Sequence, residues 1–233
     1  MKFPVRILLV LLLMGCAGRE SQSELLTLSH ADESIVDAAG PETEHIYDLL
    51  SLLRRGEAYR LKKDYVAASH EYQRFLQLDP SHRFAPFAQY QLGLCYFKQV
   101  RATDQSAISA VQARNAFEHL LRVYPESLYV RDAASKVVVL KQWEAEHAFR
   151  IGHFYYKQKA YAAAIDRFEP LLNQSGIESV AEKALYYTAI SYQKNGDSEA
   201  AEKAFQRLKT DYPHSVYLKK NKGWFRWNPL SRL

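Results

Sequence analysis

Apolar residues recur along the stretch from Tyr129 to Lys157, which contains no Pro and only one Gly, Gly152. They stand at Val130, Ala133, Ala134, Val137, Val138, Leu140, Trp143, Ala148, Phe149 and Ile151. This pattern predicts one long helix, up to about 40 Å at 1.5 Å per residue, that joins two helical stacks. A kinked pair of shorter helices is the alternative. With 9 Gly and 8 Pro among 233 residues, the chain has too few turn residues for an all-β fold, and its long segments favour helix because Ala, Leu, Lys, Glu and Gln dominate them.

A pattern of small and aromatic residues recurs four times along the chain. Its copies are Gly56, Tyr59, Ala68, Tyr72, Pro80; Gly152, Tyr155, Ala164, Phe168, with Gly176 in the place of the Pro; and Ala189, Tyr192, Ala201, Phe205, Pro213. A further copy, Gly93, Tyr96, Ala113, Phe117, Pro125, carries eight extra residues in its middle. Because several independent positions agree in register each time, the pattern indicates an internal repeat.

The residue types of this repeat suit pairs of closely packed helices. Small residues let two backbones approach, Tyr and Phe fill the groove between neighbouring units, and Pro ends the second helix. In Asn195-Gly196-Asp197, Gly suits a left-handed helix end and Asp can cap the next helix. The pattern resembles the tetratricopeptide repeat, a helix–turn–helix unit. We therefore expect an all-α solenoid of about four helix pairs with one long bridging helix.

Two irregularities interrupt the repeat. The eight extra residues predict a long loop around Arg101 to Val111. Between Pro125 and Gly152 the surplus corresponds to one extra helix. We expect an N-terminal repeat module over 45–125, and the long helix with a C-terminal repeat module over 126–216.

The first residues have the pattern of an export signal. Lys2 and Arg6 precede an apolar run from Ile7 to Met14, which is too short to span a bilayer as a helix. Leu13-Met14-Gly15-Cys16 resembles a bacterial lipobox, and this resemblance implies removal of residues 1–15 and attachment of lipid to Cys16. Ala17, in place of Asp, points to the outer membrane. The alternative is an ordinary cleaved signal in which Cys16 is incidental.

The charge of the chain is unevenly distributed. From Arg19 to His45 there are seven acidic residues and one basic residue, and no sustained apolar period. This composition predicts that residues 16–44 form a mostly flexible acidic tether. The formal net charge of +5 is too small to indicate nucleic-acid binding.

The central part of the chain carries a more specific pattern. It begins with Tyr124-Pro125-Glu126-Ser127-Leu128-Tyr129, continues through Ala133 to Leu140 and Phe154-Tyr155-Tyr156, and reaches Asp166-Arg167-Phe168-Glu169. It resembles the BamD family, the lipoproteins of the bacterial outer-membrane β-barrel assembly machine, over roughly residues 46–213. That family likewise has a lipobox, an insertion before an Ala-x-x-x-Phe helix, a Tyr-Pro-x-Ser-x-Tyr turn and a long bridging helix.

The resemblance implies a scaffold. Such a scaffold binds the periplasmic domains of the barrel-inserting subunit, works with other lipoproteins of the machinery, and helps receive unfolded outer-membrane proteins. Arg167 matches an Arg that the family uses to contact the barrel-inserting subunit; a solvated helix charge is the alternative. The family usually has five repeats and this chain shows four, so the N-terminal one is missing or replaced by the tether. A repeat lipoprotein that supports pilus assembly, polysaccharide export or cell-wall synthesis is the competing function.

The last segment, residues 217–233, combines basic residues with Trp224, Phe225 and Trp227. Such a tail can fold back to cap the last repeat, dock on a partner, or contact lipid. All three interpretations stay open, and we include the three aromatic residues among the candidate partner-binding residues.

We expect no enzymatic activity, metal, cofactor or nucleic-acid partner. No phosphate-binding loop, nucleophile motif or Cys/His cluster occurs in the sequence. Cys95 occupies a small, inward position of the repeat, which suits a buried structural thiol. Glu144 and His147 have the spacing of a di-iron helix, but the further carboxylates and second motif of such a site are missing.

Overall fold

The computed structural model describes residues 41–100 and 106–220. The predicted signal peptide, the predicted lipid attachment site Cys16, nearly all of the acidic tether and the tail residues Trp224, Phe225 and Trp227 lie outside the described residues. Within them the chain forms helices and no strand, so the all-α prediction is confirmed. None of the described helices combines the length and the apolar character that a membrane span requires.

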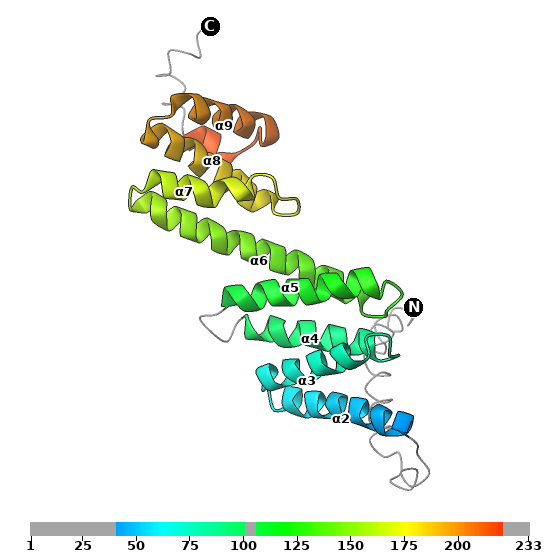
Figure 1. Ribbon diagram of the computed structural model, residues 1–233. Coiled ribbons are helices and arrows are strands. Elements are labelled where there is room, and N and C mark those ends of the chain that lie inside the picture. Colours follow the sequence, from blue (N-terminus) through cyan, green and yellow to red (C-terminus); the bar gives the residue numbers. More distant parts are fainter. Residues whose placement is uncertain (1–40, 101–105, 221–233) are drawn as a thin grey trace, which may run out of the picture. The chain divides into compact units, whose positions relative to one another are not determined.

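The helices follow one another in the order that the repeats predict (Figure 1). Their bounds are α2 Pro41–Leu61, α3 Tyr65–Leu78, α4 Ala85–Gln99, α5 Ser106–Val123, α6 Val130–Lys157, α7 Tyr161–Phe168, the 3₁₀ helix η2 Glu169–Leu171, α8 Glu178–Asn195, α9 Ser198–Asp211 and α10 Val216–Lys220. Helix α6 is continuous over 28 residues, so the prediction of one long helix is confirmed.

Contacts divide the chain into two compact units, Met1–Ala134 and Ser135–Leu233. The boundary falls inside α6, whereas we had placed a module boundary after residue 125. Helix α2 already begins at Pro41, within the predicted tether, and α10 extends to Lys220, within the predicted tail. The start of α6 thus belongs to the first unit, and the side chain of Ala133 in this part of the helix is fully buried.

In the first unit, α2, α3, α4 and α5 pack as consecutive neighbours (Figure 1). The Asp64 side chain caps α3 by accepting a hydrogen bond of 3.0 Å from the Ala67 backbone N–H. The Tyr124 hydroxyl donates to the Pro80 carbonyl at 2.8 Å. This bond joins the turn after α5 to the equivalent turn after α3, so it fixes one repeat against the next.

The predicted loop around Arg101 to Val111 is wrong in its second half. Helix α5 begins at Ser106, and residues 106–111 form its first turns. The reason is packing: Ser109 and Ala110 are buried and extend the face that carries Ala113 and Phe117. The extra residues therefore lengthen the second helix of this repeat to 18 residues, against 14 in α3.

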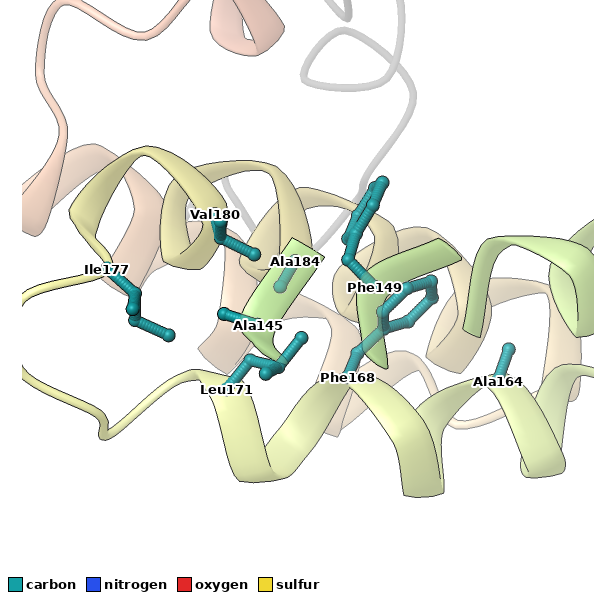
Figure 2. Packing of buried hydrophobic residues seen from close by; sticks show 8 residues of the cluster. All are labelled: Ala145, Phe149, Ala164, Phe168, Leu171, Ile177, Val180 and Ala184. Carbon is teal, nitrogen blue, oxygen red and sulfur yellow. The ribbon is translucent and has the colours of Figure 1, made fainter. Parts of the chain in front are cut away.

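In the second unit, the later part of α6 packs with α7 and α8 around one apolar cluster. Figure 2 shows its buried side chains converging from these helices: Ala145, Phe149, Ala164, Phe168, Leu171, Ile177, Val180 and Ala184. Helix α7 is short because Pro170 lacks an N–H to continue the α-helical ladder, and the chain passes into η2. Gly196 has φ +93° at the end of α8, and Asp197 caps α9 at 2.9 Å from the Ala200 N–H. This is the turn that the sequence predicts.

Candidate partner-binding site

In each repeat, an aromatic ring of the second helix packs against a small residue of the first helix. A Cβ added to Gly56 meets the Tyr72 ring at 2.9 Å, and the corresponding distances are 2.6 Å from Gly93 to Phe117 and 2.6 Å from Gly152 to Phe168. All three are shorter than a real Cβ contact, so the ring occupies the space that a side chain would need. In the fourth repeat, Ala189 and Phe205 are both fully buried.

The other residues that we assigned to repeat packing divide into two groups. The alanines of the second helices, Ala68, Ala113, Ala164 and Ala201, are fully buried. The first-helix tyrosines Tyr59, Tyr155 and Tyr192 are only partly buried, whereas Tyr96 is 9% exposed. The second-helix ring is therefore buried in each repeat, whereas the first-helix Tyr is only partly buried in three repeats and is buried in the second repeat, at Tyr96.

The tyrosine at the edge of the last repeat forms a polar link between helices. The Tyr192 hydroxyl donates to the Glu169 carboxylate, and this bond, with burial, raises the pKa of Tyr192 to about 12. The link joins η2 to α8. It thereby fixes the end of the short α7 segment.

Arg167 lies on the exposed side of α7. The opposite side of that helix is buried through Ala164, Ile165 and Phe168, so the backbone beneath Arg167 is held by the apolar cluster (Figure 2). A Cβ at Gly152 would come within 3.1 Å of the Arg167 Cβ. The absence of a side chain at Gly152 therefore sets how close α7, and with it Arg167, approaches α6.

This arrangement suits recognition of a carboxylate. A guanidinium offers planar, paired N–H donors that match a carboxylate or phosphate, and a rigid backbone lowers the cost of holding them in place. Asp166 and Glu169 are also exposed beside Arg167, so the surface of α7 and η2 carries both signs of charge. Such a surface can select a partner by charge without any catalytic group.

In the first repeat, the ring that packs on the small residue belongs to a Tyr, and its hydroxyl forms a polar cluster with Glu57 and Arg60. The Tyr72 hydroxyl donates to Glu57 Oε1 at 2.5 Å, and Glu57 accepts from Arg60 Nη2 at 2.6 Å. Burial and the neighbouring Glu57 raise the pKa of Tyr72. Burial also raises the pKa of the Cys95 thiol to about 12, which keeps it protonated and unreactive at neutral pH. The cluster is structural.

Several apolar residues of α6 lie where sequence reasoning missed them. The apolar pattern predicted the long helix but not which of its residues are exposed: Val138 is 59% exposed, Val139 is 55% exposed and Phe154 is 58% exposed. Val139 and Phe154 lie on the side of the helix opposite Gly152, and this angular position is the signal that distinguishes them, whereas Val138 lies on the same side as Phe149. Farther along α6, the His147 ring stacks on Trp143 at 5.2 Å. Among the described residues, no group of three His, Cys, Asp or Glu side chains could hold a metal ion.

Known proteins provide a direct comparison. The family model YfiO, described as outer membrane lipoprotein, matches residues 52–208. A relative from Caulobacter vibrioides, named Outer membrane protein assembly factor BamD, is 27% identical over 219 residues, which cover 85% of this chain and 72% of its own. A relative of the same name from Neisseria meningitidis serogroup A is 25% identical over 85% of this chain and 79% of its own. One from Vibrio cholerae is 28% identical over 65% of this chain and 67% of its own.

A solved crystal structure of MamA protein covers 78% of this chain at 17% identity with a TM-score of 0.27, and no conclusion rests on it. The matches to the named relatives and to the family model span both compact units. They confirm the resemblance to the BamD family that residues 124–169 indicate. The chain therefore belongs to the YfiO family of outer membrane lipoproteins.

Proposed function

We propose that this protein is a non-catalytic scaffold of the outer-membrane β-barrel assembly machinery. It binds the periplasmic domains of the barrel-inserting subunit, works beside other lipoproteins of the machinery, and helps receive unfolded outer-membrane proteins. The observation that carries this proposal is the match to relatives named Outer membrane protein assembly factor BamD, two of which cover 85% of this chain. The helical repeats support it, because stacked helix pairs offer extended binding surfaces and need no active site.

Within this scaffold, Arg167 is the residue that we propose to contact the barrel-inserting subunit. It is exposed on α7, and its backbone is fixed by the packing of Phe168 against Gly152. These two features suit a charged contact that is made without rearranging the helix. The contact pairs the Arg167 guanidinium with a carboxylate of the partner.

The test is co-purification of the tagged full-length chain from membranes in mild detergent. Arg167→Glu is expected to lower recovery of the barrel-inserting subunit at least about tenfold, which corresponds to 1.4 kcal/mol. Arg74→Glu is the matched control, because Arg74 is also exposed on a helix but lies in the other unit. Unchanged recovery with Arg167→Glu would remove Arg167 from the interface. Recovery of pilus, polysaccharide-export or cell-wall proteins in place of the barrel-inserting subunit would assign the scaffold to another assembly.

We also propose that lipid on Cys16 anchors the protein to the outer membrane with its repeats facing the periplasm. Two or three acyl chains suffice for stable anchoring, at about 0.8 kcal/mol for each buried CH₂. Cys16→Ser is expected to abolish labelling by a radioactive fatty acid and to release the protein from the membrane fraction. Persistent labelling would contradict the lipobox assignment.

For the tail, we propose that Trp224, Phe225 and Trp227 contact a partner. Two observations support this choice over capping. The outer side of α9 presents exposed Glu199, Lys203 and Gln206, and the apolar cluster of α8 and α9 is already packed against by Tyr217 and Leu218 at the start of the tail. Trp is a frequent centre of binding energy in interfaces. Replacing the three aromatic residues with Ser is expected to weaken partner recovery while the thermal midpoint stays unchanged, whereas a lowered midpoint would favour capping.

A further inference from the structure

One side of α6 carries a row of large side chains that the second unit does not cover. The row follows the helical period at Val139, Trp143, His147, Arg150, Phe154 and Lys157, which we call the outer stripe. Val139 and Phe154 are more than half exposed, and Arg150 and Lys157 are exposed, while Trp143 stacks on His147. The opposite side of the helix carries Ala145, Phe149 and Gly152, which face the apolar cluster.

The repeats show what normally lies on this side of a first helix. Phe154 comes two residues after Gly152, as Cys95 follows Gly93 and Ser191 follows Ala189. Cys95 and Ser191 are both 0% exposed, and each lies on a helix that packs against the preceding one. Helix α3 packs on α4, and α7 packs on α8 through the Phe168 and Tyr187 rings at 6.0 Å. A preceding helix of the same unit thus packs on this side of α4 and of α8, whereas α6 is the first helix within the second unit.

The side chains of the outer stripe select the kind of helix. Cys95 and Ser191 are small, whereas Phe154 at the equivalent position is bulky, so the matching helix must present a small residue at that point. The exposed charged groups of the stripe, Arg150 and Lys157, are cationic, whereas the neighbouring Glu146 is already paired with Lys183 at 2.6 Å. A second copy of the chain would bring the same cations together. We infer that the outer stripe of α6 binds an amphipathic helix of a partner protein, one that carries small apolar residues and carboxylates on its contacting face.

This inference concerns a different surface from the one that Arg167 occupies. Gly152, which sets the position of α7, lies on the opposite side of α6 from Phe154. Residues at intervals of three and four line one side of a helix, and Val139, Trp143, His147, Arg150 and Phe154 have this spacing, so they can pack along a partner helix. The two surfaces are therefore separable by substitution.

The test is photo-crosslinking of the full-length protein in cells. Benzoyl-phenylalanine replaces Phe154 in one strain and Gln206 on the polar side of α9 in a control strain. The expected result is one protein adduct at position 154 and none at 206, with the crosslinked peptide mapping to a segment of helical apolar period that contains small and acidic residues. Adducts only with lipid, with a second copy, or with another segment of this chain would overturn the inference, and so would a crosslinked peptide without that pattern.

A charge reversal makes the test specific. Arg150→Glu is expected to lower the yield of the adduct about tenfold, and exchange of the facing carboxylate of the mapped peptide for Lys is expected to restore it. Circular dichroism checks that the variant stays folded. Arg167→Glu is expected to leave this adduct unchanged, so failure here and failure of the Arg167 contact are distinguishable. A yield that is indifferent to Arg150→Glu would overturn the inference.

Discussion

The first described helix of each unit, α2 in one and α6 in the other, has a side without a covering helix, but the two sides differ in chemistry. On α2 the residue two positions after Gly56 is Ala58, which is exposed and keeps the small size of Cys95 and Ser191. On α6 the same position is Phe154. The surface of α2 thus has the ordinary shape that receives a ring from a neighbouring repeat, whereas α6 presents a ring of its own. The position of a helix at the start of its unit leaves one of its sides uncovered, and the side chains on that side determine what the side can bind.

The largest expected effect on stability compares a ring placed at a buried position with the same ring placed at the equivalent exposed position. Cys95→Phe places a ring where α3 already packs, and overpacking of this kind is expected to lower the free energy of unfolding by about 3 kcal/mol. Ala58→Phe makes the same addition on the open side of α2 and is expected to change it by less than about 0.5 kcal/mol. Urea denaturation measures both. Equal losses of unfolding free energy in Cys95→Phe and Ala58→Phe would contradict the proposed difference between the covered and uncovered positions.

The next effect concerns the small residue itself. In Gly152→Ala the added methyl group lies 2.6 Å from the Phe168 ring and 3.1 Å from the Arg167 Cβ, so α7 must shift. We expect a net loss of about 2 kcal/mol, after the gain of roughly 1 kcal/mol in helix propensity. Gly56→Ala meets only Tyr72 ring atoms, at 2.9 Å and beyond, and is expected to lose about 1 kcal/mol. Thermal unfolding of both variants checks the order, and a smaller loss for Gly152→Ala would contradict it.

The polar group of the first repeat gives a pH signature. Tyr72→Phe leaves Glu57 without one of its hydrogen bonds and is expected to cost about 1–2 kcal/mol at pH 7. Because the pKa of Tyr72 is raised in the folded state, and that of Tyr192 is raised to about 12, the unfolded chain loses these protons first as the pH rises above about 10.

The unfolding free energy of the parent is therefore expected to be flat between pH 7 and 9 with respect to these tyrosines and to fall above pH 10. Tyr72→Phe should reduce the slope of that fall, and so should Tyr192→Phe. Urea titrations at successive pH values provide the measurement. A slope that is the same in parent and Tyr72→Phe would show that the Tyr72 hydroxyl does not titrate differently in the two states.

The smallest expected effect is at the outer stripe. Phe154→Ser removes a ring that is 58% exposed, so the thermal midpoint is expected to stay within about 2 °C of the parent. Ala58→Ser is the matched control on α2. A large loss with Phe154→Ser would mean that the ring belongs to the core of the second unit, and the stripe would then not be a free surface.

Much of the fold was predictable from the sequence, because the repeat constrains each helix locally. Gly196 and Asp197 specify their turn by backbone conformation and capping, and Gly93 and Phe117 stay in contact despite eight inserted residues. The insertion itself was wrongly predicted as loop. Its continuation of α5 depends on the burial of Ser109 and Ala110, which a pattern of residue types does not reveal.

The surfaces were harder to predict than the packing. Arg167 was found through the family resemblance, and the structure adds that its Cβ lies close to Gly152. The exposure of Val139 and Phe154 was missed, because apolar residues on a long helix are ordinarily assigned to a core. Recognising them requires knowledge of which helix sides have a neighbour, and that is a property of the tertiary structure.

Thiol labelling at the four equivalent positions tests the central claim most directly. Single cysteines at 58, 95, 154 and 191, each in a chain with Cys16→Ser and without the other thiols, are exposed to a maleimide under native conditions. The account predicts that positions 58 and 154 react nearly as fast as in urea, while positions 95 and 191 react at least about a hundredfold more slowly, the ratio expected where an opening of about 2.7 kcal/mol or more must precede the reaction. Protection of position 154 equal to that of Cys95 would contradict it.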